Sequence, residues 1–181
     1  MAVQQSRRTR YEPEQYEAAW QDRWEDEGLY RAEDFSPRPP YFLLDFFPYP
    51  SGDGLHVGHS KQYVGTDLAS RFLRMRGMNV LHPMGWDAFG LPAENEAIFQ
   101  QIPPAENTPK NVANFKRQLN LQGIGYDWSR EIDSSRPDYY RWTQWLFLLM
   151  LERGLAYRAT GMQWWCPQYK TILTNEQVEN G

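Results

Sequence analysis

The chain has 181 residues, of which 41 % are hydrophobic and 15 % aromatic, and its formal net charge at pH 7 is −4. A chain of this length can bury a core without disulfide support, and its aromatic content is atypical of a disordered protein. Its 19 basic and 23 acidic side chains exclude a global basic field, so any contact with nucleic acid has to be local.

The single cysteine, Cys166, excludes an internal disulfide and favours a reducing compartment, so we expect a cytoplasmic protein. The longest apolar run, Trp145 to Leu151, is too short to cross a bilayer, and no membrane contact is expected. Residues 1–10 lack the apolar stretch of a signal peptide, and we expect a frayed tail there rather than a transit peptide.

Strand and helix patterns alternate in the first half of the chain. Residues 12–30 predict a helix with a proline in its first turn, and the prolines of residues 36–40 break the chain after it. The apolar run Tyr41–Phe47 is typical of a strand covered on both faces, as in a parallel sheet. A long helix after His59 and a short strand over Asn79–His82 follow.

The second half is predicted to be mainly helical. Its expected elements are a loop over Pro83–Pro92, helices from Ala93 to Pro103, from Thr108 to about Gly123 and from Pro137 to Gly154, and weak strands over Leu155–Arg158 and Met162–Trp165. Two clear strands are too few for a finished α/β sheet. We therefore expect an incomplete parallel sheet, whose open edge and apolar face need a partner to stay in solution.

The sharpest signal is His56-x-Gly58-His59 on a glycine-rich turn between a strand and a helix. A helix N-terminus at the carboxyl edge of a sheet favours an anion, and Gly52, Gly54 and Gly58 let the backbone approach a phosphate. Two imidazoles three residues apart project from one side of the first turn and can donate hydrogen bonds to a polyphosphate. The alternatives are a tight turn with helix-capping histidines and, more weakly, a zinc site.

A second constellation, GWDAFGLPAEN over residues 85–95, follows the second strand and is expected at the same sheet edge. There Asp87 can bind the ammonium group of a small ligand or merely cap a turn. The segment Phe46–Tyr49 can form an apolar pocket over the turn or belong to the core. On the long helix, Arg71, Arg74 and Arg76 form a basic cluster, which we expect to be a solvated face rather than a tRNA contact.

The run from Asp45 to Glu96 closely resembles the N-terminal part of bacterial-type leucyl-tRNA synthetases, which are class I aminoacyl-tRNA synthetases. The resemblance continues through YDWSRE, YYRWTQW, ERGLAY and TILTNEQVENG at residues 126–131, 139–145, 152–157 and 171–181. It implies an α/β, Rossmann-like (HUP-type) catalytic domain that activates leucine with ATP and magnesium and passes it to tRNA-Leu. It also implies an N-terminal tail and helix over residues 1–40, the first half of the catalytic domain over 41–158, and the start of the connective or editing insertion over 159–181.

The same resemblance assigns the candidate site residues. His56, Gly58 and His59 match the HIGH signature that holds the ATP phosphates, with the two histidines as catalytic residues and Gly54 beside them. The positions that match the family's leucine site are Phe46, Phe47 and Tyr49 for the side chain and Asp87 for the ammonium group. Phe46 stands where many relatives carry methionine.

Two departures from the family pattern qualify these expectations. The lysine loop KMSKS is absent, and Lys170 is alone in the last third of the chain. Tyr169 stands where many relatives have the second cysteine of a Cys-x-x-Cys zinc knuckle that Cys166 would begin, so we expect no structural zinc. The partners implied are ATP, leucine, tRNA-Leu and the C-terminal part of a synthetase.

Other readings remain open at this point. The chain can be a non-catalytic module that binds ATP or an amino acid, or a subunit that needs a second chain. It can be a nucleotidyltransferase of another family with a His-x-Gly-His motif, although residues 85–94 and 126–131 argue against this. A structural or scaffolding protein without a ligand is the last alternative.

Overall fold

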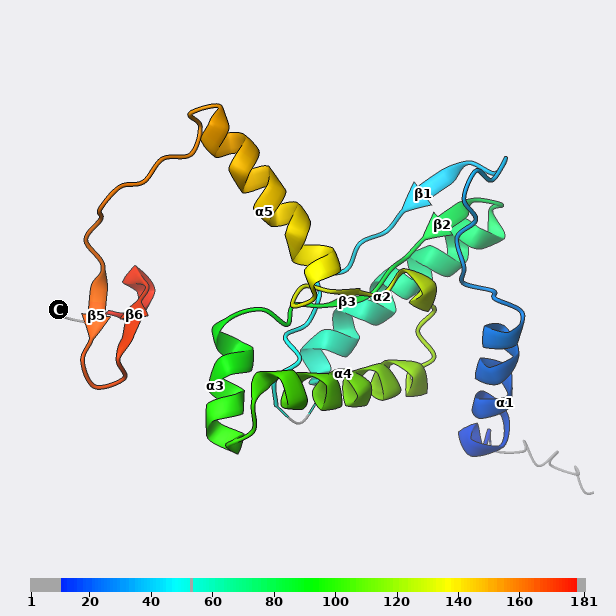
Figure 1. Ribbon diagram of the computed structural model, residues 1–181. Coiled ribbons are helices and arrows are strands. Elements are labelled where there is room, and N and C mark those ends of the chain that lie inside the picture. The colour runs from blue at the N-terminus through cyan, green and yellow to red at the C-terminus, as the bar shows by residue number, and fades with distance from the viewer. Residues whose placement is uncertain (1–10, 53, 179–181) are drawn as a thin grey trace, which may run out of the picture. The chain divides into compact units, whose positions relative to one another are not determined.

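The computed structural model describes residues 11–52 and 54–178. The chain divides into two compact units, the first ending at Tyr140 and the second beginning at Arg141. Each unit is described by itself (Figure 1).

The first unit opens with helix α1, Pro13–Asp26, and the expected proline occupies its first turn. The helix ends at Asp26, and Gly28, which the sequence offers as a stop, adopts a φ of +59° that a helix cannot continue. Strands β1, Pro40–Phe42, and β2, Asn79–Leu81, then pair in parallel. Helix α2, Val57–Met75, connects them, as the sequence predicted (Figure 1).

The prediction of a covered strand over Tyr41–Phe47 is wrong in length and in burial. The β1 ladder has three residues, all of them exposed, and one further bond joins the Leu43 N–H to the Leu81 carbonyl at 2.9 Å. In the part of the chain that the structure describes, β1 pairs only with β2, so its other edge and its apolar side chains stay uncovered. Beyond Leu43 the segment up to Pro48 has no regular secondary structure.

A second parallel pair joins β3, Gly85–Trp86, to β4, Ile132–Asp133, and β3 lies within the expected loop Pro83–Pro92. Two-residue strands carry no periodic signal, which is why the sequence did not show them. Helix α3, Leu91–Gln100, agrees with the expected helix. Helix α4, Pro104–Leu121, starts a turn before the expected cap at Thr108, because Pro104 takes the first helical turn and Pro109 is tolerated inside the helix.

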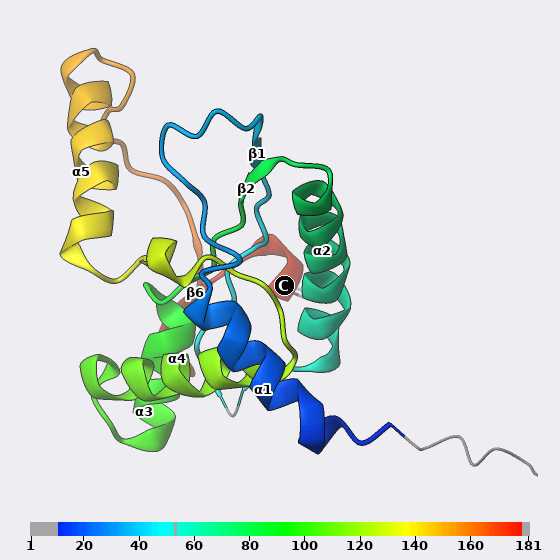
Figure 2. The ribbon, with the colours of Figure 1, turned by 90° about the vertical axis from the view of Figure 1, so that its right-hand side faces the viewer.

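The core of this unit lies between α2, α4 and the β2–β3 segment. Its fully buried side chains include Tyr63, Met84, Trp86, Phe115 and Leu119. Helices α3 and α4 lie side by side in both views (Figure 2). The packed core fixes the starts of α2 and β3, where the candidate site lies.

Helix α5, Pro137–Glu152, begins at the end of the first unit and continues into the second, and Gly154 with a φ of +71° follows its end. The second unit then forms an antiparallel hairpin from β5, Trp164–Cys166, and β6, Thr171–Leu173. Of the two weak strands expected here, the later one overlaps β5 and the earlier one does not form. In the described residues, every helix is too short or too polar to cross a membrane.

Candidate active site

The two histidines of the motif build the first turn of α2 as a reciprocal cap. His56 is the N-cap residue, and its Nδ1 accepts a hydrogen bond from the Gly58 N–H at 3.1 Å. The Nδ1 of His59 accepts in turn from the His56 N–H at 3.2 Å. Each side chain thus satisfies one of the backbone donors that a helix start leaves open.

This cap also fixes the tautomer of both rings. Because Nδ1 is an acceptor in each ring, the neutral imidazole carries its proton on Nε2. The rings stack with their centroids 3.8 Å apart and an interplanar angle of 28°. The alternative of capping histidines is therefore correct for Nδ1, and it leaves the two Nε2–H groups as paired donors beside a helix N-terminus.

The glycine between the histidines makes room for this cap. A β-carbon at Gly58 would lie 2.8 Å from Cε1 and 2.9 Å from Nδ1 of His56. The sequence analysis assigned Gly58 to close approach of a phosphate. In the structure, the space that its missing side chain leaves is adjacent to the ring of His56.

His59 packs against two aromatic side chains, Tyr63 of α2 and Phe46 of the segment after β1. The centroid of its ring lies 5.8 Å from that of Tyr63, on which it stacks, and 6.1 Å from that of Phe46. The Tyr63 hydroxyl donates to the carbonyl of Phe46 at 3.2 Å. Partial burial and the neighbouring His56 lower the pKa of His59 below its ordinary value of about 6.5. The neutral, donating form of His59 is therefore favoured in the folded chain.

Of the residues that the resemblance assigned to leucine, Phe46 contacts His59, and Asp87 is joined to the Phe46–Tyr49 segment. The Asp87 N–H donates to the Pro48 carbonyl at 3.0 Å, which holds the β3 extension against the Phe46–Tyr49 segment. Phe47 packs over Gly85, where a β-carbon would lie 2.6 Å from the phenyl ring. Tyr49 is 54 % exposed and Phe46 50 % exposed. Phe47 is partly buried against the core, as the core alternative for this segment held, whereas Phe46 and Tyr49 remain open to a ligand.

A buried carboxylate that the sequence analysis missed lies beneath this arrangement. Asp45 is 2 % exposed and accepts hydrogen bonds from the Thr66 hydroxyl at 2.6 Å and from the Tyr126 hydroxyl at 2.8 Å. Nε2 of the buried His82 lies 3.0 Å from Oδ2 of Asp45, the oxygen that also accepts from Tyr126. Burial, and then the charge of Asp45, raise the pKa of Tyr126 well above its usual range. Asp45 was not found because its partners are 21 to 81 residues away and form no local motif.

The basic cluster on α2 is not the solvated face that was expected. Nε of Arg71 lies 2.7 Å from Asp67, and its guanidinium donates to the Gly123 carbonyl at 2.6 Å. Arg74 donates to the carbonyls of Tyr30 and Val80, each at 2.7 Å. These two arginines tie α2 to neighbouring segments, and only Arg76 is exposed.

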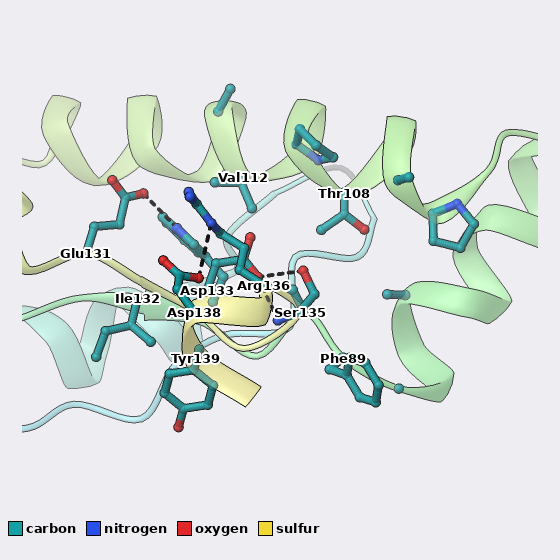
Figure 3. A pocket seen from close by; sticks show the side chains of 18 of the residues that line it. Phe89, Thr108, Val112, Glu131, Ile132, Asp133, Ser135, Arg136, Asp138 and Tyr139 are labelled. Atoms are coloured by element: carbon teal, nitrogen blue, oxygen red, sulfur yellow. Dashed lines mark hydrogen bonds and ion pairs between the residues drawn. The ribbon is translucent and has the colours of Figure 1, made fainter. Parts of the chain in front are cut away.

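An open groove of about 980 Å³ lies between α3, α4 and the turn before α5 (Figure 3). Four of its charged side chains form two ion pairs, Lys116 with Glu131 at 2.6 Å and Arg136 with Asp138 at 3.5 Å. None of the described residues that line it belongs to the predicted site. Trp86 and Ala88 line the groove, and Asp87 between them does not.

Comparison with known proteins shows the family to which the chain is similar. A family model described as tRNA synthetases class I (M) matches residues 45–181. The leucine–tRNA ligase of Protochlamydia amoebophila is 51 % identical over 172 residues, which are 95 % of this chain and 20 % of that protein. The alpha subunit of leucine–tRNA ligase from Aquifex aeolicus is 51 % identical over 94 % of this chain and 27 % of its own length.

Solved structures give the same result. The LeuRS of Agrobacterium radiobacter K84, in a ternary complex with tRNA and LeuAMS, matches with a TM-score of 0.86 and 38 % identity, over 94 % of this chain and 21 % of that chain. A methionyl-tRNA synthetase from Mycobacterium tuberculosis bound to methionyl-adenylate matches with a TM-score of 0.67 and 25 % identity, over 78 % of this chain and 27 % of that chain.

These comparisons confirm the expected fold, an incomplete α/β catalytic domain. The chain spans 20–27 % of the length of these relatives. The family model covers the chain from Asp45 to Gly181. The chain belongs to the class I tRNA synthetases.

Proposed function

We propose that this chain carries the part of a leucine–tRNA ligase site that holds the ATP phosphates and leucine. The observation that carries the proposal is the reciprocal cap of His56 and His59. It commits both Nδ1 atoms to the backbone, so that two Nε2–H donors are available next to a helix N-terminus. Relatives named leucine–tRNA ligase, 51–52 % identical over 95 % of the chain, support the choice of leucine.

In the proposed reaction, a leucine carboxylate oxygen attacks the α-phosphorus of magnesium-bound ATP. The bond to the bridging oxygen breaks, and leucyl-adenylate and pyrophosphate form. His56 and His59 donate their Nε2–H groups to phosphate oxygens, on which negative charge builds in the transition state. Gly54 and Gly58 are assigned to the same phosphate-binding turn. Magnesium enters with ATP as part of the substrate.

The leucine end of the site consists of Phe46, Phe47 and Tyr49 around the side chain and of Asp87 for the ammonium group. The bond between the Asp87 N–H and the Pro48 carbonyl supports this assignment, because it brings the aromatic segment and the carboxylate-bearing segment together. The contact of Phe46 with His59 joins the leucine end to the phosphate end. The two substrates would therefore meet at the start of α2.

We further propose that catalysis needs a second polypeptide segment. The sequence contains no lysine loop to neutralise the departing pyrophosphate. A relative that this chain matches is named as an alpha subunit, which supports a site completed by another chain. In this scheme residues 1–40 form a tail and helix, 41–158 the first half of the catalytic domain and 159–181 the start of an insertion. The completed enzyme would transfer leucine to tRNA-Leu.

Leucine-dependent exchange between ATP and pyrophosphate tests the proposal. We expect no exchange by the chain alone, and exchange when a fragment carrying the remainder of a leucine–tRNA ligase is added. His56→Ala should lower the restored rate by at least about 100-fold, the typical cost of removing a transition-state donor. Gln62→Ala, at an exposed position one turn along α2, is the matched control and should not change the rate.

Exchange by the lone chain would contradict the need for a second segment. If the combined fragments stay inactive while calorimetry shows binding of ATP or leucine, the chain is a binding module without catalysis. The missing lysine loop is the observation that favours this second candidate.

We also propose that the chain binds no structural zinc. Cys166 lies on β5, and Tyr169 stands where the zinc knuckle of the family has its second cysteine. A phenol is a poor zinc ligand in place of a thiolate. Elemental analysis should give less than one zinc per chain. One zinc per chain that is lost in Cys166→Ser would contradict this expectation.

A further inference from the structure

One side chain of α4 reaches the turn that leads into the histidine motif. The Oε1 atom of Gln118 accepts a hydrogen bond from the Leu55 N–H at 2.7 Å. Leu55 immediately precedes His56, so this bond fixes the backbone at the entrance to the cap. The same amide fills the space beside Gly54, because a β-carbon there would collide with the Gln118 side chain.

A second amide of the same helix reaches the other end of this turn. The Nδ2 atom of Asn111 donates to the Pro50 carbonyl at 3.0 Å. Pro50 is buried and directly follows Tyr49, which is assigned to leucine. Both hydrogen bonds are partly buried, where a lost bond costs more than it does in solvent.

The spacing of the two amides explains why one helix can hold both ends. Residues seven apart on an α-helix return to the same face after two turns. Asn111 and Gln118 are seven apart in α4, and they contact Pro50 and Leu55 respectively. The two contacts are to main-chain atoms, so they hold Pro50 and Leu55 whatever the side chains of these two residues are.

We propose that Asn111 and Gln118 are positioning residues, which together form an amide clasp that holds the ends of the turn between the leucine and phosphate sites. Gln118 sets the entry to His56, and Asn111 sets the exit from Tyr49. Each residue acts through the backbone and touches neither substrate. The consequence for ligands rests on the proposed function, whereas the clasp itself is a property of the free chain.

The clasp predicts that each of the two residues affects the affinity for a different substrate. Gln118→Ala removes the acceptor at the histidine end and should weaken binding of magnesium-bound ATP about tenfold, with leucine affinity within about twofold. Asn111→Ala removes the donor at the leucine end and should weaken leucine about tenfold with a smaller effect on ATP. Gln118→Glu keeps an Oε1 acceptor and should keep the Leu55 amide protected, while its negative charge beside Gly54 should lower ATP affinity without changing leucine affinity. A role in general stability would lower both affinities together in every variant.

Two measurements on the full chain test this inference. Hydrogen–deuterium exchange of the Leu55 amide, resolved by fragmentation mass spectrometry, reports the clasp without any ligand. It should become about tenfold faster in Gln118→Ala and stay within about twofold in Gln118→Glu. Calorimetric titrations with magnesium-bound ATP and with leucine report the divided effect. Asn120→Ala, at an exposed amide on the same helix, is the control and should change neither readout.

The outcomes separate the clasp from the proposed function. Unchanged Leu55 exchange in Gln118→Ala would overturn the clasp. Faster exchange with unchanged ATP affinity would overturn its positioning role. If the wild-type chain binds neither substrate while Leu55 exchange responds as expected, the proposed function fails and the clasp stands.

Discussion

The imidazole rings of His56 and His59 stack at 3.8 Å while each accepts a backbone N–H through Nδ1. Both hydrogen bonds need a ring whose Nδ1 carries no proton. Protonation of the His59 ring converts its Nδ1 from an acceptor into a donor and breaks that half of the cap. The geometry that presents two Nε2–H donors therefore depends on pH.

The first prediction concerns the stability that His59 contributes. Its pKa in the folded chain lies below the ordinary value of about 6.5, so as the pH falls the unfolded chain binds the proton first. The free energy of unfolding should be highest above that value, fall as the pH drops towards the lowered pKa, and level off below it. Because the ring is partly exposed, the effect should stay under about 1 kcal/mol. Urea denaturation between about pH 7.5 and about pH 5.5 measures it, and His59→Gln should flatten the slope.

The second prediction compares two glycines of α2. Gly58→Ala places a β-carbon against the His56 ring and should displace it, whereas nothing lies within 4 Å of a β-carbon at Gly65. Alanine favours a helix over glycine by about 1 kcal/mol, so Gly65→Ala should raise stability by about that amount and preserve ATP binding. Gly58→Ala should gain less stability and lose ATP affinity at least about tenfold. Equal ATP affinities of the two variants, measured by calorimetry, would contradict this assignment of the His56 ring.

The third prediction concerns the buried carboxylate. Asp45→Asn replaces one acceptor oxygen by a donor, so at least one of its partners Thr66, His82 and Tyr126 loses its bond. We expect a loss of about 2–4 kcal/mol in the free energy of unfolding, the usual cost of breaking a buried charged network. Tyr126→Phe should cost less, because two partners remain. Asp26→Asn, at an exposed position on α1, should stay within about 0.5 kcal/mol and serves as the control.

The fourth prediction concerns self-association. Large apolar side chains of α5 are exposed, among them Trp145 at 57 % and Leu148 at 60 %. Exposed apolar area of this kind promotes association, so the isolated chain should sediment as a mixture of oligomers rather than as a monomer. Leu148→Lys should raise the monomer fraction, whereas Gln144→Lys, which adds the same charge at a polar position, should not. A monodisperse wild-type monomer in sedimentation velocity would contradict the expectation.

The sequence predicted the elements that have a local signature. The apolar period of α2, the prolines that open α1 and α5, and the His-x-Gly-His string each depend on neighbours a few residues apart. They were found with small errors at the ends. The exposed β1 was misjudged because an apolar run indicates a strand that can be covered, not one that is covered in this chain.

The remaining features depend on contacts between distant segments. The pairing of Gly85 with Ile132, the bond from Leu55 to Gln118 and the Asp45 network join residues 21 to 81 positions apart and have no spacing rule. The same holds for Arg71, whose partner Gly123 makes a structural tie out of an expected surface charge. Only the tertiary structure decides such contacts.

The Asp45 network also orders events during synthesis. Asp45 and both motif histidines leave the ribosome long before Tyr126, whose hydroxyl completes the set of bonds on the carboxylate. A nascent chain that ends before Tyr126 holds the residues that we propose for ligand binding, without the complete set of hydrogen bonds on Asp45. Ligand binding should therefore arise as a step once Tyr126 has emerged, and not grow gradually with the length of the nascent chain.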